Sequence, residues 1–197
     1  MKKLLLNPFE KNPETSLFIF GLAVTAIGSY LAYLFNGRYD GVIDLHFTKS
    51  VTLAQPFIDN LINIVCLFAT LFFVGKLINS KTRIIDIVNP ILICRIPFYL
   101  LTFSNFRNYI SDISVSLLEN FNPKAMPSEM NLSPISMIVL GFFAIISILC
   151  LIWFVILLYN GFKIATNSKT GMHKLYFALA ILVAEIISGI LISFLNY

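Results

Sequence analysis

The chain has 197 residues, of which 58% are hydrophobic and 12% are charged, and its formal net charge is +4. Soluble domains typically carry about 25% charged residues, so this composition excludes an ordinary soluble globule and indicates an integral membrane protein. The basic residues are scattered without a dense cluster, so we expect no nucleic-acid partner. The sequence also lacks the HExxH, P-loop, GxSxG and dinucleotide-binding motifs, and we therefore expect no enzymatic activity, cofactor or metal.

The first residues, MKKLLLNPFEK, have the basic start of a signal peptide without its apolar core. The apolar run covers only Leu4–Leu6 before Asn7 and Pro8 end it, which is too short for a cleaved signal. We expect this segment to be retained and to lie at the membrane interface, anchored by Leu4–Leu6 and Phe9.

Apolar runs of about 20 residues predict membrane-spanning helices. The sequence contains five, and we predict an all-α, polytopic membrane protein that forms one bundle of five transmembrane helices over residues 16–197, after a short N-terminal segment over residues 1–15. The predicted spans are Ser16–Phe35, Phe57–Ile78, Ile84–Phe103, Pro134–Tyr159 and Lys174–Leu195.

The loop charges predict the orientation of this bundle. Nine Lys and Arg residues lie on the side of the N-terminus, four lie on the other side, and Arg95 falls inside the third run. Because cytoplasmic loops carry an excess of basic residues, we expect a cytoplasmic N-terminus and a non-cytoplasmic C-terminus. Six basic residues lie in or beside the short cytoplasmic loops, and we expect them to contact anionic lipid headgroups. They are Lys76, Lys81, Arg83, Lys163, Lys169 and Lys174.

Small residues recur at helical spacing along the first run and allow a neighbouring helix to approach closely. They are Gly21, Thr25, Gly28, Ser29 and Ala32. We expect this face to pack within the bundle, and dimerisation is the alternative.

The first outer loop, Gly41–Ala54, alternates in polarity, with Ile43, Leu45 and Phe47 on one side. This period of two predicts a short strand or hairpin. Asp40, Asp44 and His46 lie in the same region and are residue types that can hold a metal. A solvated loop explains the same composition, and it is the interpretation that we prefer.

The second run carries a polar stripe. Asp59, Asn63, Cys66 and Thr70 follow one helix face. The stripe fits either the lining of a pathway or a set of interhelical hydrogen bonds. We favour hydrogen bonding because the stripe fades into Phe73, and we expect Asp59, near the outer end, to reach water.

Arg95 is the main anomaly of the third run, because it lies about 16 Å into the predicted helix. Glu185 lies at the matching depth of the fifth run. A central charge is expensive unless it is paired. We therefore predict that the third and fifth spans pack side by side, with a buried Arg95–Glu185 ion pair. Pro97 frees the carbonyl of Ile93, which we expect to be a second acceptor for Arg95.

The loop between the third and fourth runs contains a helical pattern. Ile110, Ile113, Leu117 and Phe121 recur at helical spacing and predict an amphipathic helix over Tyr109–Asn120. This helix either lies on the outer membrane surface or caps the end of the bundle.

The segment from Trp153 to Ile187 resembles the end of a bacterial-type Yip1-domain membrane protein. The matching positions are Trp153, the Gly161-Phe162-Lys163 turn, Ser168-Lys169-Thr170 in the following loop, and Gly171 before the fifth run. The resemblance implies five helices, a cytoplasmic N-terminus, a non-cytoplasmic C-terminus and a place in a bacterial cytoplasmic membrane. Eukaryotic relatives bind small GTPases, but their long N-terminal region and their acidic-Leu-Tyr-Gly-Pro stretch are missing here, so GTPase binding is not expected.

We expect a non-enzymatic component that interacts with or organises other components of the bilayer, with membrane lipids as partners and with other membrane proteins or a second copy as further candidates. The Arg95–Glu185 pair then has a structural role. The alternative is a small transporter or channel. Its polar site would consist of Arg95, Glu185, Asp59, Asn63 and Thr70.

Overall fold

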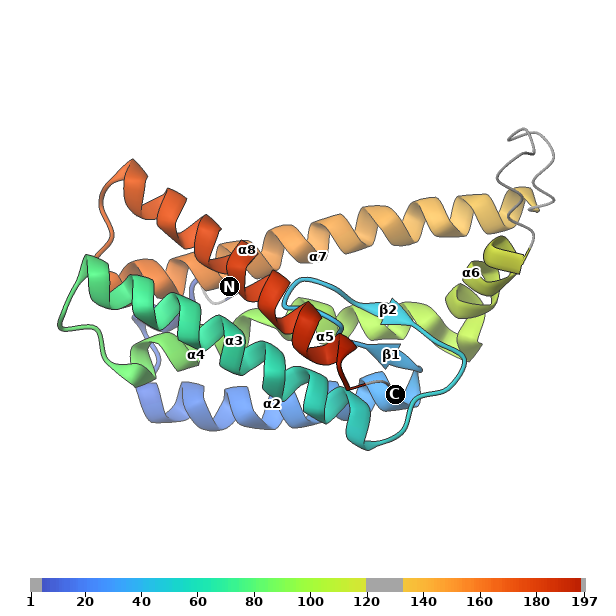
Figure 1. The fold of residues 1–197 in the computed structure, drawn as a ribbon, viewed down its shortest axis with the longest axis horizontal. Coiled ribbons are helices and arrows are strands. Elements are labelled where there is room, and N and C mark those ends of the chain that lie inside the picture. The colour runs from blue at the N-terminus through green and yellow to red at the C-terminus, as the bar shows by residue number, and fades with distance from the viewer. Residues whose placement is uncertain (1–4, 120–132, 196–197) are drawn as a thin grey trace.

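In the computed structural model, which describes residues 5–119 and 133–195, the helices form one bundle (Figure 1). The described residues contain five helical spans long and apolar enough to cross a membrane, which confirms the predicted number. These spans are α2 (Glu14–Leu34), α3 (Ala54–Ile78), a third span made of α4 (Ile84–Cys94) and α5 (Ile96–Leu101), α7 (Pro134–Thr166) and α8 (Gly171–Ser193).

The two ends of the bundle differ in character. One end holds the α3–α4 turn, the α7–α8 turn and the 3-10 helix η1 (Pro8–Glu10), which packs on α7. We call this the basic end, because the six loop Lys and Arg residues predicted to meet lipid lie there. The opposite end holds the antiparallel strands β1 (Gly37–Arg38) and β2 (His46–Phe47), the 3-10 helix η2 (Thr102–Asn108) and α6 (Tyr109–Glu119) (Figure 1).

The third span lies at the centre of the bundle. It packs against α2, α3 and α7, whereas α8 packs along α3. The prediction that the third and fifth spans lie side by side is therefore wrong. Equal depth of two charges does not decide which helices are neighbours. The buried face of α8 contains Ala180, Ala184 and Ser188, and these small side chains allow its close approach to α3.

The small-residue face of α2 packs inside the bundle, as predicted. A Cβ at Gly21 would lie 2.7 Å from the Cβ of Leu92, and a Cβ at Gly28 would collide with the ring of Tyr99. Both glycines are thus required for the close approach of α2 to the third span.

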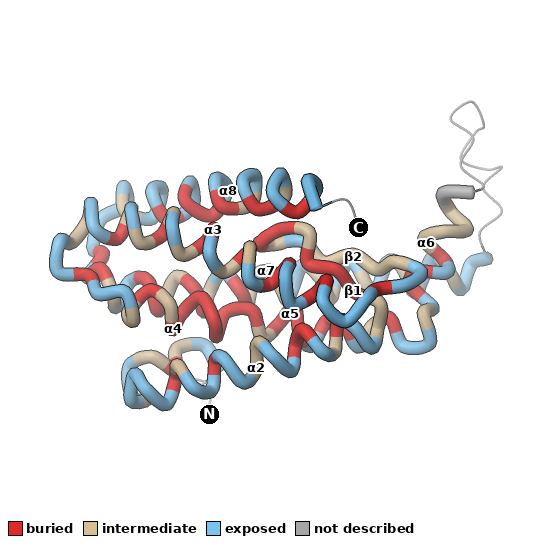
Figure 2. The backbone as a smooth tube through the Cα atoms, turned by 60° about the horizontal axis from the view of Figure 1, so that its bottom comes forward, coloured by how far each residue is buried: buried red, intermediate tan, exposed pale blue. Residues whose placement is uncertain are grey.

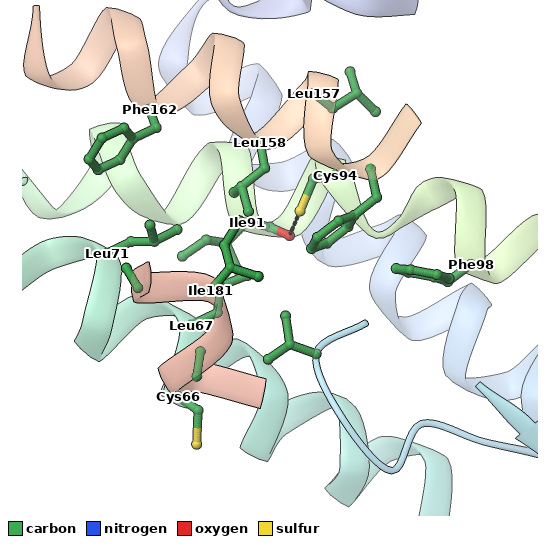
Figure 3. Packing of buried hydrophobic residues seen from close by; sticks show 14 of the residues in the cluster. Cys66, Leu67, Leu71, Ile91, Cys94, Phe98, Leu157, Leu158, Phe162 and Ile181 are labelled. Carbon is green, nitrogen blue, oxygen red and sulfur yellow. Dashed lines mark hydrogen bonds between the residues drawn. The ribbon is translucent and has the colours of Figure 1, made fainter. Parts of the chain in front are cut away.

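The apolar core lies where α3, the third span, α7 and α8 meet. Figure 3 shows Leu67, Ile91, Leu158 and Ile181 from these four elements in one cluster. The thiol of Cys94 donates to the carbonyl of Ile91 at 3.2 Å. All three cysteines are free, and two of them are buried, in keeping with packing as small apolar side chains. The first half of α7, residues 134–150, is by contrast largely exposed.

The predicted amphipathic helix is present as α6 (Tyr109–Glu119). Ile110 and Ile113 are buried and Leu117 is half-buried. Through this face α6 packs on η2 at the end of the bundle. Asn120 and Phe121, which the prediction included, lie outside the described residues.

Candidate functional site

A loop segment is inserted into the bundle at the end of α2. The predicted hairpin exists only as the two-residue strands β1 and β2, which pair Gly37 with Phe47 and Arg38 with His46. Between them the chain turns inward, so that Tyr39 and Val42 are fully buried (Figure 2). We call residues 39–45 the inserted segment. Its backbone carries polar groups into an apolar interior, where each of them needs a partner.

The start of this segment is held by a direct ion pair. Arg38 donates from Nε to Asp59 Oδ2 at 2.6 Å and from Nη2 to Asp59 Oδ1 at 2.9 Å. Asp59 is fully buried and Arg38 nearly so. The expectation that Asp59 reaches water is therefore wrong, because the turn after α2 brings Arg38 over it. Two parallel hydrogen bonds of this kind give the pair a defined geometry as well as a charge balance.

The rest of the predicted stripe divides into two parts. Asn63 donates to the carbonyl of Tyr39 at 2.8 Å, so it also holds the inserted segment. Thr70 bonds only to carbonyls of its own helix, at Cys66 and Leu67. We preferred hydrogen bonds between helices as the interpretation of this stripe. Asp59 and Asn63 instead bond to the loop after α2.

Arg95 lies fully buried at the break between α4 and α5. Its Nε donates to Asn60 Oδ1 at 2.9 Å, and its Nη1 donates to the carbonyl of Val42 at 3.1 Å. The guanidinium lies over the ring of Tyr39, 5.3 Å from its centre. We predicted the carbonyl of Ile93 as the second acceptor for Arg95, and this prediction is wrong, because the acceptor is the loop carbonyl of Val42. Pro97 instead lies in the first turn of α5, after the break.

Glu185 reaches the same peptide group from the other side. Its Oε2 accepts from the backbone N–H of Ile43 at 2.8 Å. Since the carbonyl of Val42 and the N–H of Ile43 belong to one peptide unit, that unit bridges Arg95 and Glu185. The predicted direct contact between Arg95 and Glu185 is therefore wrong. The inserted segment lies between the two charged groups, and each of them bonds to its backbone. We call this arrangement the bridged pair.

Gly41 is required for this arrangement. A Cβ at this position would collide with the carboxylate of Glu185, reaching 2.7 Å from Oε2. Only glycine leaves the carboxylate room beside the backbone here.

Asn60 is the residue at the centre of this network that sequence reasoning missed. Besides accepting from Arg95, it donates to Ser29 Oγ at 2.8 Å and is fully enclosed. An asparagine directly after Asp59 in an apolar run was the available signal. The network thus connects α2, α3, the third span and α8 through one loop.

His46 lies at the more exposed edge of the site. Its Nδ1 is 2.6 Å from Asp40 Oδ2, and this hydrogen bond raises the pKa of His46. Among the described residues, no group of three or more His, Cys, Asp and Glu side chains is arranged to hold a metal ion. Asp40 and His46 therefore form a pair rather than part of a ligand set.

The motif residues of the last third have packing roles. Trp153 donates to the carbonyl of Leu5 at 2.9 Å, and Gly161 lies against Pro90. Phe162 is in the core, and Ser168 is buried in the α7–α8 turn. These contacts fasten the N-terminal segment and the third span to α7.

Two hollows at the side of the bundle are almost entirely apolar. One of about 420 Å³ lies between α2, the third span and α7 and is lined by Phe20, Ile93, Trp153 and Leu157 among others. One of about 480 Å³ lies between α7 and α8, with Ile43, Val155, Phe177 and Ile181 in its walls and Lys174 among its lining residues. Neither is lined by Arg95, Asp59 or Asn63.

Comparison with known proteins found no relative. No family model matches the chain, no curated protein matches it, and no solved structure matches it. The comparisons thus identify no Yip1 domain in this chain.

Proposed function

We propose that this chain is a non-enzymatic, multi-pass membrane protein that acts through contacts with other components of the bilayer. The main support is that the ionic groups inside the bundle bond to the protein itself: Arg38 to Asp59, and Arg95 and the half-buried Glu185 to one peptide. A transport path requires the buried polar groups to face a cavity, whereas Asp59, Arg95 and Glu185 line none of four hollows that the described residues form at the basic end and side of the bundle. The bridged pair then serves as a structural lock.

Purified protein in liposomes tests this proposal. We expect no flux of K⁺, Cl⁻ or H⁺ above that of empty liposomes. We also expect cross-linking in native membranes to capture a specific membrane-protein partner or a second copy. Flux that disappears in an Asn63→Ala variant, with the bundle still folded, would contradict the proposal.

We further propose that the basic end faces the cytoplasm of a bacterial cell and that the C-terminus lies outside. The excess of loop Lys and Arg supports this orientation, as does the resemblance to bacterial Yip1-domain proteins. A reporter fused after Tyr197 should be active only on the outer side. Cytoplasmic activity of that reporter would reverse the orientation.

Lipid contacts are the second part of the proposal. Lys163, Lys169 and Lys174 are exposed at the basic end and available to anionic headgroups. Arg83 is engaged by Glu14 and Asp86, which reduces its own contribution. Replacing the three lysines by glutamine should weaken the preference for anionic lipid and leave the fold intact. An unchanged preference would limit these lysines to setting topology.

A small transporter or channel is the alternative, and two observations favour it. The Nη2 of Arg95 is buried without a hydrogen-bond partner among the described residues, and Glu185 is only half-buried. Both groups could meet a solute in another conformation of the inserted segment. Chloride flux that Arg95→Gln removes would select this alternative.

A further inference from the structure

A charged hollow of about 380 Å³ lies at the basic end, between the N-terminal segment and the α7–α8 turn. Lys163, Ser168 and Lys169 line it from α7 and the turn. Asn7 and Glu10 line it from the N-terminal segment. The hollow is separate from the inserted segment and its network.

Hydrogen bonds hold both walls of this hollow in place. Asn160 donates to the carbonyl of Leu6 at 2.8 Å and Trp153 to that of Leu5 at 2.9 Å, so the N-terminal segment is fastened to α7. At the turn, Asn167 adopts a left-handed conformation, and the N–H of Ser168 donates to the carbonyl of Lys163 at 3.3 Å. The charged groups are therefore carried by fixed backbone.

The two walls have opposite charge. Lys163 and Lys169 bring two ammonium groups to one wall, and Glu10 brings a carboxylate to the other, with Asn7 donating to it at 2.8 Å. Ser168 is only 3% exposed, and its Oγ has no hydrogen-bond partner among the described residues. A buried hydroxyl without a partner is costly, and Ser168 is therefore a candidate donor to an anionic oxygen bound at this wall.

This distribution suits a ligand with a phosphate and a primary amine. The lysines and Ser168 match a phosphodiester, and Glu10 matches an ammonium that can donate hydrogen bonds. We propose that the charged hollow binds the phosphoethanolamine headgroup of a bilayer lipid. The inference rests on the proposed lipid contacts at the basic end and names a lipid class for one site.

A second, apolar hollow lies beside an earlier part of α7, and its presence favours a lipid over a soluble phosphate as the ligand. Trp153, Leu157, Asn160 and Ile164 follow one face of α7, and the first two line the apolar hollow of about 420 Å³. Trp153 lies ten residues from Lys163, about 15 Å along the helix. Charged and apolar hollows thus follow each other in the order of a headgroup and an acyl chain.

The charge pattern also predicts selectivity. Phosphatidylcholine carries a quaternary ammonium with no N–H to donate to Glu10. Phosphatidylglycerol has the phosphate but no cation. Phosphatidylethanolamine is the lipid of the three that matches both walls.

The single tryptophan makes this testable, because Trp153 lines the adjoining apolar hollow. Lipids with brominated chains quench a nearby tryptophan, so quenching in phosphatidylcholine bilayers measures relative association at this site. We expect phosphatidylethanolamine to associate about two- to fivefold more strongly than phosphatidylcholine, the range for one exposed charged contact. Glu10→Gln should bring the two lipids to parity. Lys163→Gln with Lys169→Gln should weaken association of both phosphatidylethanolamine and phosphatidylglycerol.

Lys76→Gln with Lys81→Gln is the matched control, since it removes the same charge at the same end but outside the hollow, and it should leave the selectivity unchanged. Equal quenching by brominated phosphatidylethanolamine and phosphatidylcholine in the wild type would overturn the site, as would a preference that survives Glu10→Gln. A preference for phosphatidylglycerol alone would refute this site and leave the proposed anionic-lipid contacts standing. Displacement of the lipid by micromolar soluble phosphoethanolamine would assign the hollow to a soluble ligand instead.

Discussion

Two pairs of opposite charges inside the bundle are compensated in different ways. Arg38 and Asp59 meet directly, through two hydrogen bonds, near the end of α2. Arg95 and Glu185, deeper in the bundle, meet only through the Val42–Ile43 peptide. The direct pair fastens a loop to one helix. The bridged pair fastens the same loop between the third span and α8, which do not pack extensively on each other.

The difference shows how backbone can substitute for a missing counter-charge. A peptide unit carries a dipole, with its carbonyl end negative and its N–H end positive. The carbonyl of Val42 faces the cation and the N–H of Ile43 faces the anion, so each bond polarises the group that makes the other. The deeper charges thus depend on the conformation of a loop, whereas the direct pair depends on two side chains.

The largest expected effect comes from breaking the direct pair. Asp59→Leu leaves Arg38 buried without its bidentate partner and should destabilise the protein by about 3–5 kcal/mol. Adding Arg38→Leu should recover most of that loss, because no uncompensated charge then remains. Thermal unfolding in detergent, with yield as a second readout, measures both. Arg83→Leu, which breaks the surface ion pairs of Arg83 with Glu14 and Asp86, is the control and should shift the unfolding temperature only slightly. Failure of the double variant to recover would show that Arg38 is held chiefly by other contacts.

The bridged pair should respond to the same experiment with weaker coupling. Arg95→Leu leaves the carbonyl of Val42 without its donor, at about 1–3 kcal/mol for a buried group, and leaves Asn60 Oδ1 only the longer hydrogen bond from the Tyr99 hydroxyl at 3.5 Å. Glu185→Leu leaves the N–H of Ile43 without its acceptor. The side chains of Arg95 and Glu185 are connected only through a peptide unit, so the coupling energy between their two substitutions should stay below about 1 kcal/mol. For Arg38 and Asp59, which bond directly, the coupling energy should exceed about 2 kcal/mol. A double-mutant cycle measures both values, and equal coupling in the two pairs would remove the distinction between them.

Gly41 tests the geometry of the bridge. Gly41→Ala places a methyl group against the Glu185 carboxylate and should cost about 1–3 kcal/mol by overpacking. The loss should shrink in a Glu185→Ala background, where the collision is gone. Gly141→Ala in α7 is the matched control, because a Cβ there meets nothing within 4 Å. An equal loss in both backgrounds would indicate a conformational requirement at Gly41 rather than close approach.

The smallest expected effect is a pH dependence at the edge of the inserted segment. The Asp40 hydrogen bond raises the pKa of His46, so the folded state binds a proton more tightly than the unfolded state. The resulting stability is fully present below the unfolded pKa of about 6.5 and is lost as pH rises through the folded pKa. The unfolding temperature should fall slightly between about pH 6 and pH 8. Both side chains are more than a third exposed, so salt should reduce the change, and His46→Gln should abolish it.

Several features of the fold could be predicted from local pattern. The apolar runs located the five spans, the spacing of Gly21 and Gly28 identified a packing face, and the period of Ile110 and Ile113 located α6. Arg95 and Glu185 also reach the same peptide, in agreement with their predicted equal depth. The direct contact between them was predicted wrongly, because no local pattern shows that a loop enters the space between two helices.

The sequence by itself determined the number of the spans and their approximate positions, although α7 continues to Thr166, beyond the predicted end at Tyr159. These follow from the length and polarity of each run, which set its transfer free energy into a bilayer. Only the tertiary structure decided the partners: Arg38 for Asp59, Asn60 and the carbonyl of Val42 for Arg95, and the N–H of Ile43 for Glu185. The reason is that a buried charge requires compensation at its position in space, and loop backbone can provide it as well as another side chain.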